Sequence, residues 1–347
     1  NTPTITPGFT PTPSATVDFT ANPTFTALPT LQPSITPASV DFPPEPTSLF
    51  LPDESISNQV RSAVELINVG DFEQAQERAA SDRRTQGGRF SPNAYYYEAL
   101  AYIGLDQQQD AIDTLNDAQE RMDTFNGVAA EDVLVYQPLV NLGYAEVALD
   151  QGRDALEANN LTDARTFFEE ARRLAQSTLD FDPRYVRAYE LIAESHLLLN
   201  DYQSAIDILN SAQVVPEIGA DQRILVQLGE AYLSQGRTLQ AQGDANGAQI
   251  AFDAAAYQGY YSVVVNPFNR PSHRIKIESA IALNDPGLAV IYSEEYLFFF
   301  PNTAEGFLFL GNARQAEGNL SQALGAYGFG LRTGEEGEIR AELLATR

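Results

Sequence analysis

Two histidines are the only side chains in this 347-residue chain that would titrate near neutral pH without perturbation, because the chain contains no cysteine. His196 and His273 lie far apart in the sequence, in different helical segments. No zinc-binding His pair, nucleophile elbow or phosphate-binding loop with a lysine accompanies them. Because His273 follows Pro271 at the expected start of a helix, we predict a surface or capping role for it.

Neighbouring carboxylates are the next candidates for chemistry. Glu169 with Glu170, and Glu294 with Glu295, are adjacent in sequence and would point about 100° apart on a helix. The glycines of "GAYGFGLRTGEEG" fall on an expected helix and are followed by acidic residues, which would repel phosphate. The sequence therefore predicts solvated carboxylates, no catalytic residue, no metal site and no cofactor, and a protein that is not an enzyme.

Hydroxyl groups dominate residues 1–48, which contain twelve Thr, four Ser and eleven Pro. This composition favours an extended, polyproline-like backbone and, in a secreted protein, dense O-glycosylation. The sequons at Asn160 and Asn319 lie at expected turns, where N-linked glycans could be attached. Covalent glycans are thus expected partners, with candidate O-linked sites at Thr2, Thr4, Thr6, Thr10, Thr12 and Thr36.

The net charge of −26 argues against two classes of partner. Such an excess of acidic residues repels nucleic acid and anionic lipid. No run of 18 apolar residues could cross a membrane as a helix. Because the sequence starts at Asn1 and carries no signal peptide, we expect a processed chain, secreted or on the cell surface.

The apolar residues of residues 1–48 argue against a pure spacer. A segment so rich in Thr and Pro has too little apolar surface to fold alone, so a partner would be needed to order it. A spacer also has no need of four Phe. We therefore predict that this arm packs on protein through the anchors Phe9, Val17, Phe19, Phe25, Leu28, Leu31, Ile35 and Phe42.

From about Ser55 the sequence changes to apolar residues at helical spacing, separated by short turns with Gly, Asn or Asp. The segments "AIDTLNDAQ" (111–119) and "AIDILNSAQ" (205–213) share seven of nine residues. A second pair, "LVNLGYAEVALDQGR" and "LVQLGEAYLSQGR", supports the same internal duplication. The unit is a helical hairpin of about 34 residues.

These hairpins resemble the tetratricopeptide repeat (TPR) family, most clearly in "AYELIAESHLLLNDYQSAIDILNSAQVVP". The resemblance implies an all-α, right-handed α-solenoid of about seven hairpins, and it places His196 where the family packs an aromatic residue. We expect repeats centred on Ala75, Ala111, Ala164, Ala205, Ala248, Ala289 and Ala323. The predicted domains are the arm (1–48), the solenoid (49–333) and a capping or docking helix (334–347).

In this family, first-helix residues line a concave groove. By resemblance, we expect a groove in this chain lined by apolar residues and by arginines that could bind a peptide backbone. The family's Lys-based carboxylate clamp is not carried over, because Lys276 is the only lysine. The expected groove residues are Val60, Val64, Ile67, Tyr96, Leu100, Ile103, Leu149, Arg153, Leu156, Arg187, Leu198, Leu233, Arg237 and Arg274.

A second excess of aromatic residues lies in "YLFFFPNTAEGFLFLG". Since one hairpin is too small to bury them all, we expect end-to-end contacts between subunits through Tyr296, Phe298, Phe299, Phe300, Phe307 and Phe309.

Two functions fit these features. The extended arm would reach about 150 Å, roughly twice the length of seven stacked repeats at about 10 Å each. An arm of that length could enter a neighbouring copy, and head-to-tail contacts build open filaments. The leading prediction is thus a subunit of an extracellular, glycosylated fibril. The alternative is a surface-anchored TPR module that binds a foreign peptide or protein, with residues 1–48 as a glycosylated stalk.

Overall fold

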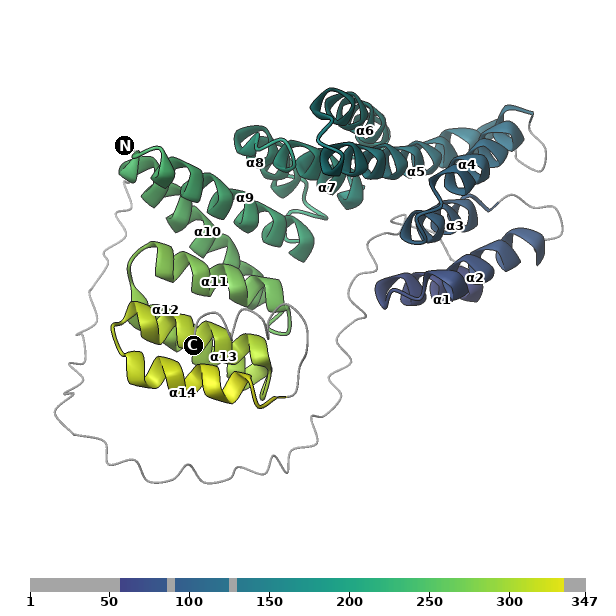
Figure 1. Ribbon diagram of the computed structural model, residues 1–347. Coiled ribbons are helices and arrows are strands. Elements are labelled where there is room, and N and C mark those ends of the chain that lie inside the picture. The colour runs from purple at the N-terminus through teal and green to yellow at the C-terminus, as the bar shows by residue number, and fades with distance from the viewer. Residues whose placement is uncertain (1–56, 86–90, 125–129, 334–347) are drawn as a thin grey trace, which may run out of the picture. The chain divides into compact units, whose positions relative to one another are not determined.

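A computed structural model describes residues 57–85, 91–124 and 130–333. The predicted arm (1–48) and the predicted C-terminal helix (334–347) lie outside these residues. Within the described ranges the chain forms fourteen α-helices and no strand (Figure 1). They are α1 (Asn58–Asn68), α2 (Phe72–Thr85), α3 (Pro92–Gly104), α4 (Gln108–Asp123), α5 (Ala130–Glu157), α6 (Leu161–Phe181), α7 (Val186–Leu197), α8 (Tyr202–Gln213), α9 (Gln222–Ala241), α10 (Ala245–Val265), α11 (Arg270–Ala282), α12 (Pro286–Phe299), α13 (Ala304–Ala316) and α14 (Leu320–Gly330).

The helices pair in order as seven hairpins, and each first helix also contacts the first helix of the next hairpin. This confirms the all-α solenoid of seven hairpins. The alanine that marks the centre of each predicted repeat is buried in the second helix of its hairpin, where its small side chain lets the two helices approach closely. These alanines are Ala75, Ala111, Ala164, Ala205, Ala248, Ala289 and Ala323.

One turn recurs inside all seven hairpins. Two or three residues after the end of the first helix lies a residue with a left-handed backbone, which is Gly, Asn or Asp in every case, such as Asn200 with φ 60°. In six hairpins the next residue is an Asp or Asn whose side chain accepts a hydrogen bond from a backbone N–H of the second helix. These residue types are those that tolerate left-handed backbone and cap helices. Both sequon residues, Asn160 and Asn319, serve as such caps.

The third and fifth hairpins are longer than the others. Their helices α5, α6, α9 and α10 have 28, 21, 20 and 21 residues, against 11–16 in the remaining ten. Each long pair closes around one aromatic ring. A Cβ added at Gly152 would lie 2.3 Å from the Phe168 ring, and one at Gly236 would lie 2.5 Å from the Phe252 ring. Only glycine allows the ring to approach the facing helix this closely.

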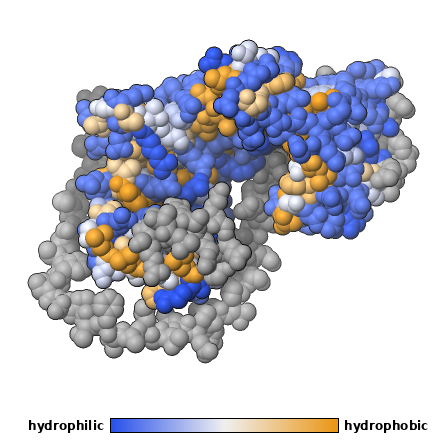
Figure 2. Space-filling view, viewed as in Figure 1, coloured by the Kyte–Doolittle hydropathy of each residue, from blue (hydrophilic) through white to orange (hydrophobic). Residues whose placement is uncertain are grey.

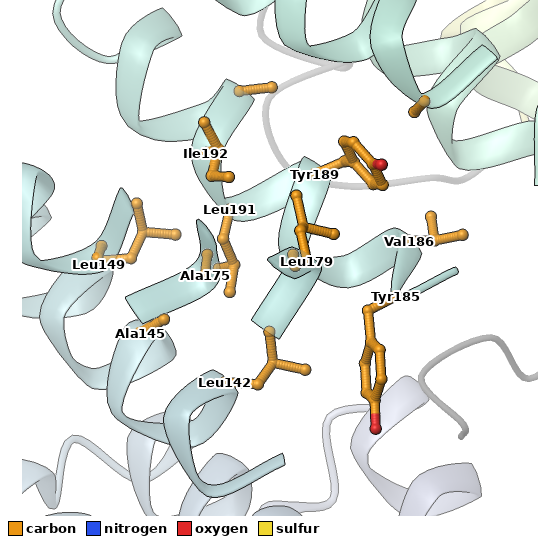
Figure 3. Packing of buried hydrophobic residues seen from close by; sticks show 14 of the residues in the cluster. Leu142, Ala145, Leu149, Ala175, Leu179, Tyr185, Val186, Tyr189, Leu191 and Ile192 are labelled. Atoms are coloured by element: carbon orange, nitrogen blue, oxygen red, sulfur yellow. The ribbon is translucent and has the colours of Figure 1, made fainter. Parts of the chain in front are cut away.

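The largest hydrophobic cluster extends from α1 to α9 and is densest where α5, α6 and α7 meet. Figure 3 shows Leu142 and Leu149 of α5 facing Ala175 and Leu179 of α6 and Leu191 of α7. Residues from consecutive hairpins thus share one core, so each repeat depends on its neighbours for burial.

Candidate binding surfaces

The predicted apolar groove is not an exposed surface. Five of its residues are almost completely buried, and their prediction as groove residues is wrong: Val60, Val64, Tyr96, Leu149 and Leu233. The other five are half-buried against the core clusters: Ile67, Leu100, Ile103, Leu156 and Leu198. The physical reason is that the first helix of each hairpin packs on the first helix of the next, as α1 does on α3 and α5 does on α7, and this contact covers the apolar side chains.

The four predicted groove arginines do lie on first helices, and Arg153, Arg237 and Arg274 stay partly exposed, at 41%, 57% and 42% of the side chain. Each forms an ion pair with a glutamate on the first helix of a neighbouring hairpin. Arg187 of α7 pairs with Glu146 of α5 at 2.7 Å, and Arg237 of α9 pairs with Glu278 of α11 at 2.6 Å. The other pairs are Arg153 with Glu194 and Arg274 with Glu230. These ion pairs use part of each guanidinium group, and binding of a peptide backbone by these arginines stays a prediction.

The pairing between α5 and α7 is reciprocal. Glu146 and Arg153 of α5 are matched by Arg187 and Glu194 of α7, so the order of the charges is reversed between the two helices. At the buried pair, Arg187 donates two hydrogen bonds to Glu146, at 2.7 and 2.8 Å, and the Tyr96 hydroxyl of α3 donates a third at 3.1 Å. Burial alone lowers the pKa of Arg187, but Glu146, together with Glu190 and Tyr96, outweighs it and raises that pKa well above its ordinary value. These groups fix how consecutive hairpins stack.

A shallow cleft of about 660 Å³ lies where α6, α7 and α8 meet. Arg172 reaches into it and donates to the Ser195 hydroxyl at 3.3 Å. His196 lines the cleft, half-buried, and its Nδ1 lies 3.0 Å from an Asp201 carboxylate oxygen. His196 is therefore not a fully packed core residue, although burial still lowers its pKa.

The aromatic excess near residue 300 is partly buried by three helices. Tyr296 of α12 and Phe309 of α13 are buried together with Ile277 of α11, so their prediction as end contacts is wrong. Phe299, Phe300 and Phe307 are half-buried, and Phe298 remains 79% exposed. A role in contacts between subunits stays a prediction for these four.

His273 is buried among these rings, which corrects the surface role that the sequence predicted. Its ring lies 5.5 to 5.8 Å from those of Tyr296, Phe299 and Phe300. Nε2 lies 2.8 Å from the Pro267 carbonyl oxygen, which can only accept, so Nε2 carries the proton and donates. Burial lowers the pKa of His273.

The buried His273 makes stability depend on pH. The unfolded chain binds a proton on this ring as the pH falls through about 6.5, whereas the folded chain, with the lowered pKa, binds it only at lower pH. The unfolded state therefore holds more protons in this window, and the free energy of unfolding falls as the pH is lowered from 7 towards 5. We expect His273→Gln to flatten this part of a plot of Tm against pH. An unchanged slope of Tm against pH in this variant would contradict a lowered pKa of His273 in the folded chain.

Lys276 is also buried, 3% exposed, one turn along α11. Its Nζ donates to the Glu295 carboxylate at 2.8 Å and lies 4.2 Å from the centre of the Tyr292 ring. The charge is thus compensated by one carboxylate and by an aromatic face.

Exposed apolar side chains gather on the C-terminal hairpins instead of in the predicted groove. Of sixteen exposed large hydrophobic residues in the described part of the chain, twelve lie between Ile250 and Phe329. In Figure 2, orange surface lies over part of this region, whereas the surface over α3 to α5 is mostly blue. Of these twelve residues, only Phe298 was predicted from the sequence as a contact residue. The signal that could have found this surface is the lack of charge in α10, which holds a single charged residue, Asp253.

The described residues contain neither a candidate metal-binding group nor a candidate membrane-spanning helix. No group of three His, Asp or Glu side chains among them could hold a metal ion. None of the helices formed by residues 57–85, 91–124 and 130–333 is long and apolar enough to cross a membrane.

The sequence matches no protein-family model and no curated protein. The fold is similar to the crystal structure of PilW, a widely conserved type IV pilus biogenesis factor, with TM-score 0.51 and 16% identity over 73% of this chain and 98% of that one. Two further similar structures are the C-terminal part of a TPR protein from Cytophaga hutchinsonii (TM-score 0.48, 16% identity, 82% and 99% covered) and a thermophilic TPR protein from Thermus thermophilus (0.43, 18%, 58% and 98%). At these identities the likeness concerns the fold alone, a TPR-type α-solenoid.

Proposed function

We propose that this chain is a protein-interaction module that assembles with copies of itself into an extracellular, glycosylated fibril. In this proposal the arm, residues 1–48, packs on a neighbouring copy. The solenoid forms the shaft, and glycans together with the negative charge keep the fibrils apart. Secretion and glycosylation rest on the composition of residues 1–48.

The observation that carries the proposal is the concentration of exposed apolar side chains between Ile250 and Phe329. A chain with a net charge of −26 stays soluble through repulsion between its copies, and an apolar region of this extent normally marks a binding surface. The arm carries Phe9, Phe19, Phe25 and Phe42 but no Lys or Arg, so its contacts with protein would be largely apolar.

The proposal is tested with the full-length protein from a secreting host, by negative-stain imaging and analytical ultracentrifugation. We expect threads that lengthen with concentration. Replacing the four arm phenylalanines by serine should abolish the threads and leave the helical circular dichroism unchanged. Exchanging Thr4, Thr6, Thr10 and Thr12 for Ser is the matched control, since it keeps every hydroxyl and every aromatic ring.

Isolated particles at every concentration, for the unmodified chain, would contradict the fibril. That result would favour the alternative of a stalked binding module, for which changes in residues 1–48 affect only the reach of the solenoid. Glycan attachment is measured separately, by intact mass before and after enzymatic deglycosylation.

A further inference from the structure

The two long hairpins provide an internal comparison for the surface of α10. Helices α6 and α10 have equal length, begin after an Asx cap and end at residues with nearly identical backbone angles, φ −145° and −146°. Each of the six buried positions of α6 corresponds to a buried position of α10 at a constant offset in sequence, and α10 buries two more residues, Ala251 and Gln258. The matched buried pairs are Ala164 and Ala248, Phe168 and Phe252, and Thr178 and Ser262.

The exposed positions of the two helices differ sharply in chemistry. In the second half of α10, beyond the exposed Asp253, they form an uncharged stripe, here called the α10 face: Tyr257, Tyr260, Tyr261, Val264 and Val265. The matched positions of α6 hold Arg173, Gln176, Ser177, Asp180 and Phe181, and α6 carries seven charged residues against one in α10. The α5–α6 hairpin folds with polar residues at four of these five positions. Packing within a long hairpin of this type therefore does not require the α10 face to be apolar.

Exposed aromatic side chains also lie beyond α10. Phe268, exposed just after α10, meets the Phe299 ring edge-on at 5.5 Å, and Phe299 meets the exposed ring of Phe298 at 5.2 Å. Tyr257 and Tyr261 stack on one another, with their ring centres 6.4 Å apart. Exposed Tyr, Phe and Val side chains thus occur on α10, just after it and at the end of α12.

The uncharged aromatic side chains of this surface favour a proline-rich segment as the ligand. Exposed aromatic side chains without charge are the surfaces on which proline-rich segments dock, because such segments are already extended and lose little entropy on binding. Residues 1–48 contain eleven prolines and no cation. Their few charges, Asp18, Asp41 and Glu45, would be repelled by most of an acidic molecule and least by an uncharged surface.

We infer that the α10 face is the docking site for the proline-rich arm, residues 1–48, of a second copy of this chain. This inference rests on the proposed function and names the surface that it uses. Tyrosine rings contact the proline rings and the Phe side chains of the arm, and the tyrosine hydroxyls donate to its backbone carbonyls, which have no partners within an extended chain.

Photo-crosslinking in the full-length, assembled protein tests the docking site directly. A benzophenone amino acid replaces Tyr261, and nitrogen-15-labelled and unlabelled chains are mixed before assembly. We expect cross-links from position 261 to residues 1–48 that join a labelled to an unlabelled chain. The same reagent at Ser177, the matched position on α6, should give at least tenfold less of this product.

The outcomes separate the docking site from the proposed function. Cross-links confined to one chain, cross-links to the helices of another copy, or none at all in an assembled sample would each overturn the docking site while leaving the fibril intact. A sample that stays monomeric would overturn the fibril and the docking site together.

A charge placed on the α10 face gives an independent measurement. Val265→Asp should raise the critical concentration for assembly at least tenfold without lowering Tm by more than its control does. Phe181→Asp is that control, since it occupies the matched position on α6 with a similar exposed fraction, 48% against 44%. Equal effects of the two substitutions on assembly would overturn the docking site.

Discussion

Replacing Arg187 by alanine should destabilise the solenoid by about 3–5 kcal/mol, because it leaves the carboxylate of Glu146 buried without its cation. Glu146 is only 8% exposed and receives two hydrogen bonds from Arg187. The remaining hydrogen bond, from Tyr96, is neutral and cannot compensate the charge. We expect a clear fall in Tm by circular dichroism and a loss of hydrogen-exchange protection where α5 and α7 meet.

Arg173→Ala is the matched control for that substitution. Arg173 pairs with Glu170 on the exposed surface of α6, and its removal should change stability by about 0.5 kcal/mol or less. The double variant Glu146→Gln with Arg187→Met should be less damaging than Arg187→Ala, because it removes both charges. A double variant as unstable as Arg187→Ala would show that shape, and not the unpaired charge, determines the loss.

Phe168→Ala should be comparably severe, with a cost of about 3–5 kcal/mol, because the ring is fully buried between α5 and α6 and fills the space above Gly152. Removing it leaves a cavity beside a glycine, which has no side chain to fill it. The loss should be local, since in a solenoid each repeat contacts only its neighbours. Hydrogen exchange followed by mass spectrometry should show the loss of protection concentrated in α5, α6 and α7.

The internal duplication supplies the control for this prediction. Phe252→Ala removes the corresponding ring above Gly236, and its loss of protection should centre on α9, α10 and α11. Uniform loss of protection along the whole chain in both variants would contradict local coupling and would indicate that the described hairpins unfold as a single cooperative unit.

The sequence was sufficient to predict the fold because the signals that specify it are local. A small residue such as Ala205 near the start of the second helix recurs in every hairpin, and a turn such as Asn200–Asp201 recurs in six of the seven. Each of them is a short-range requirement of helix approach, left-handed backbone or capping, so each can be recognised without knowing the rest of the structure.

The surfaces could not be predicted in the same way, because exposure depends on neighbouring hairpins. Tyr96 and Leu149 have the spacing of groove residues, yet the next first helix covers them. Arg153 looks like a free cation until Glu194, from the following repeat, is placed beside it. In contrast, the uncharged composition of α10 was visible in the sequence, and comparison with α6 would have identified its exposed positions.

Lys276 determines how the folded protein reacts with reagents that modify amines. It is the only lysine in the chain, and its amino group lies in the interior against Glu295 and Tyr292. Reagents that acylate amines should leave the side chains of the folded solenoid unmarked, and aldehydes, which fix most proteins through lysine, should find no lysine within reach. The rate at which Lys276 is labelled would then measure how often α11 opens to solvent.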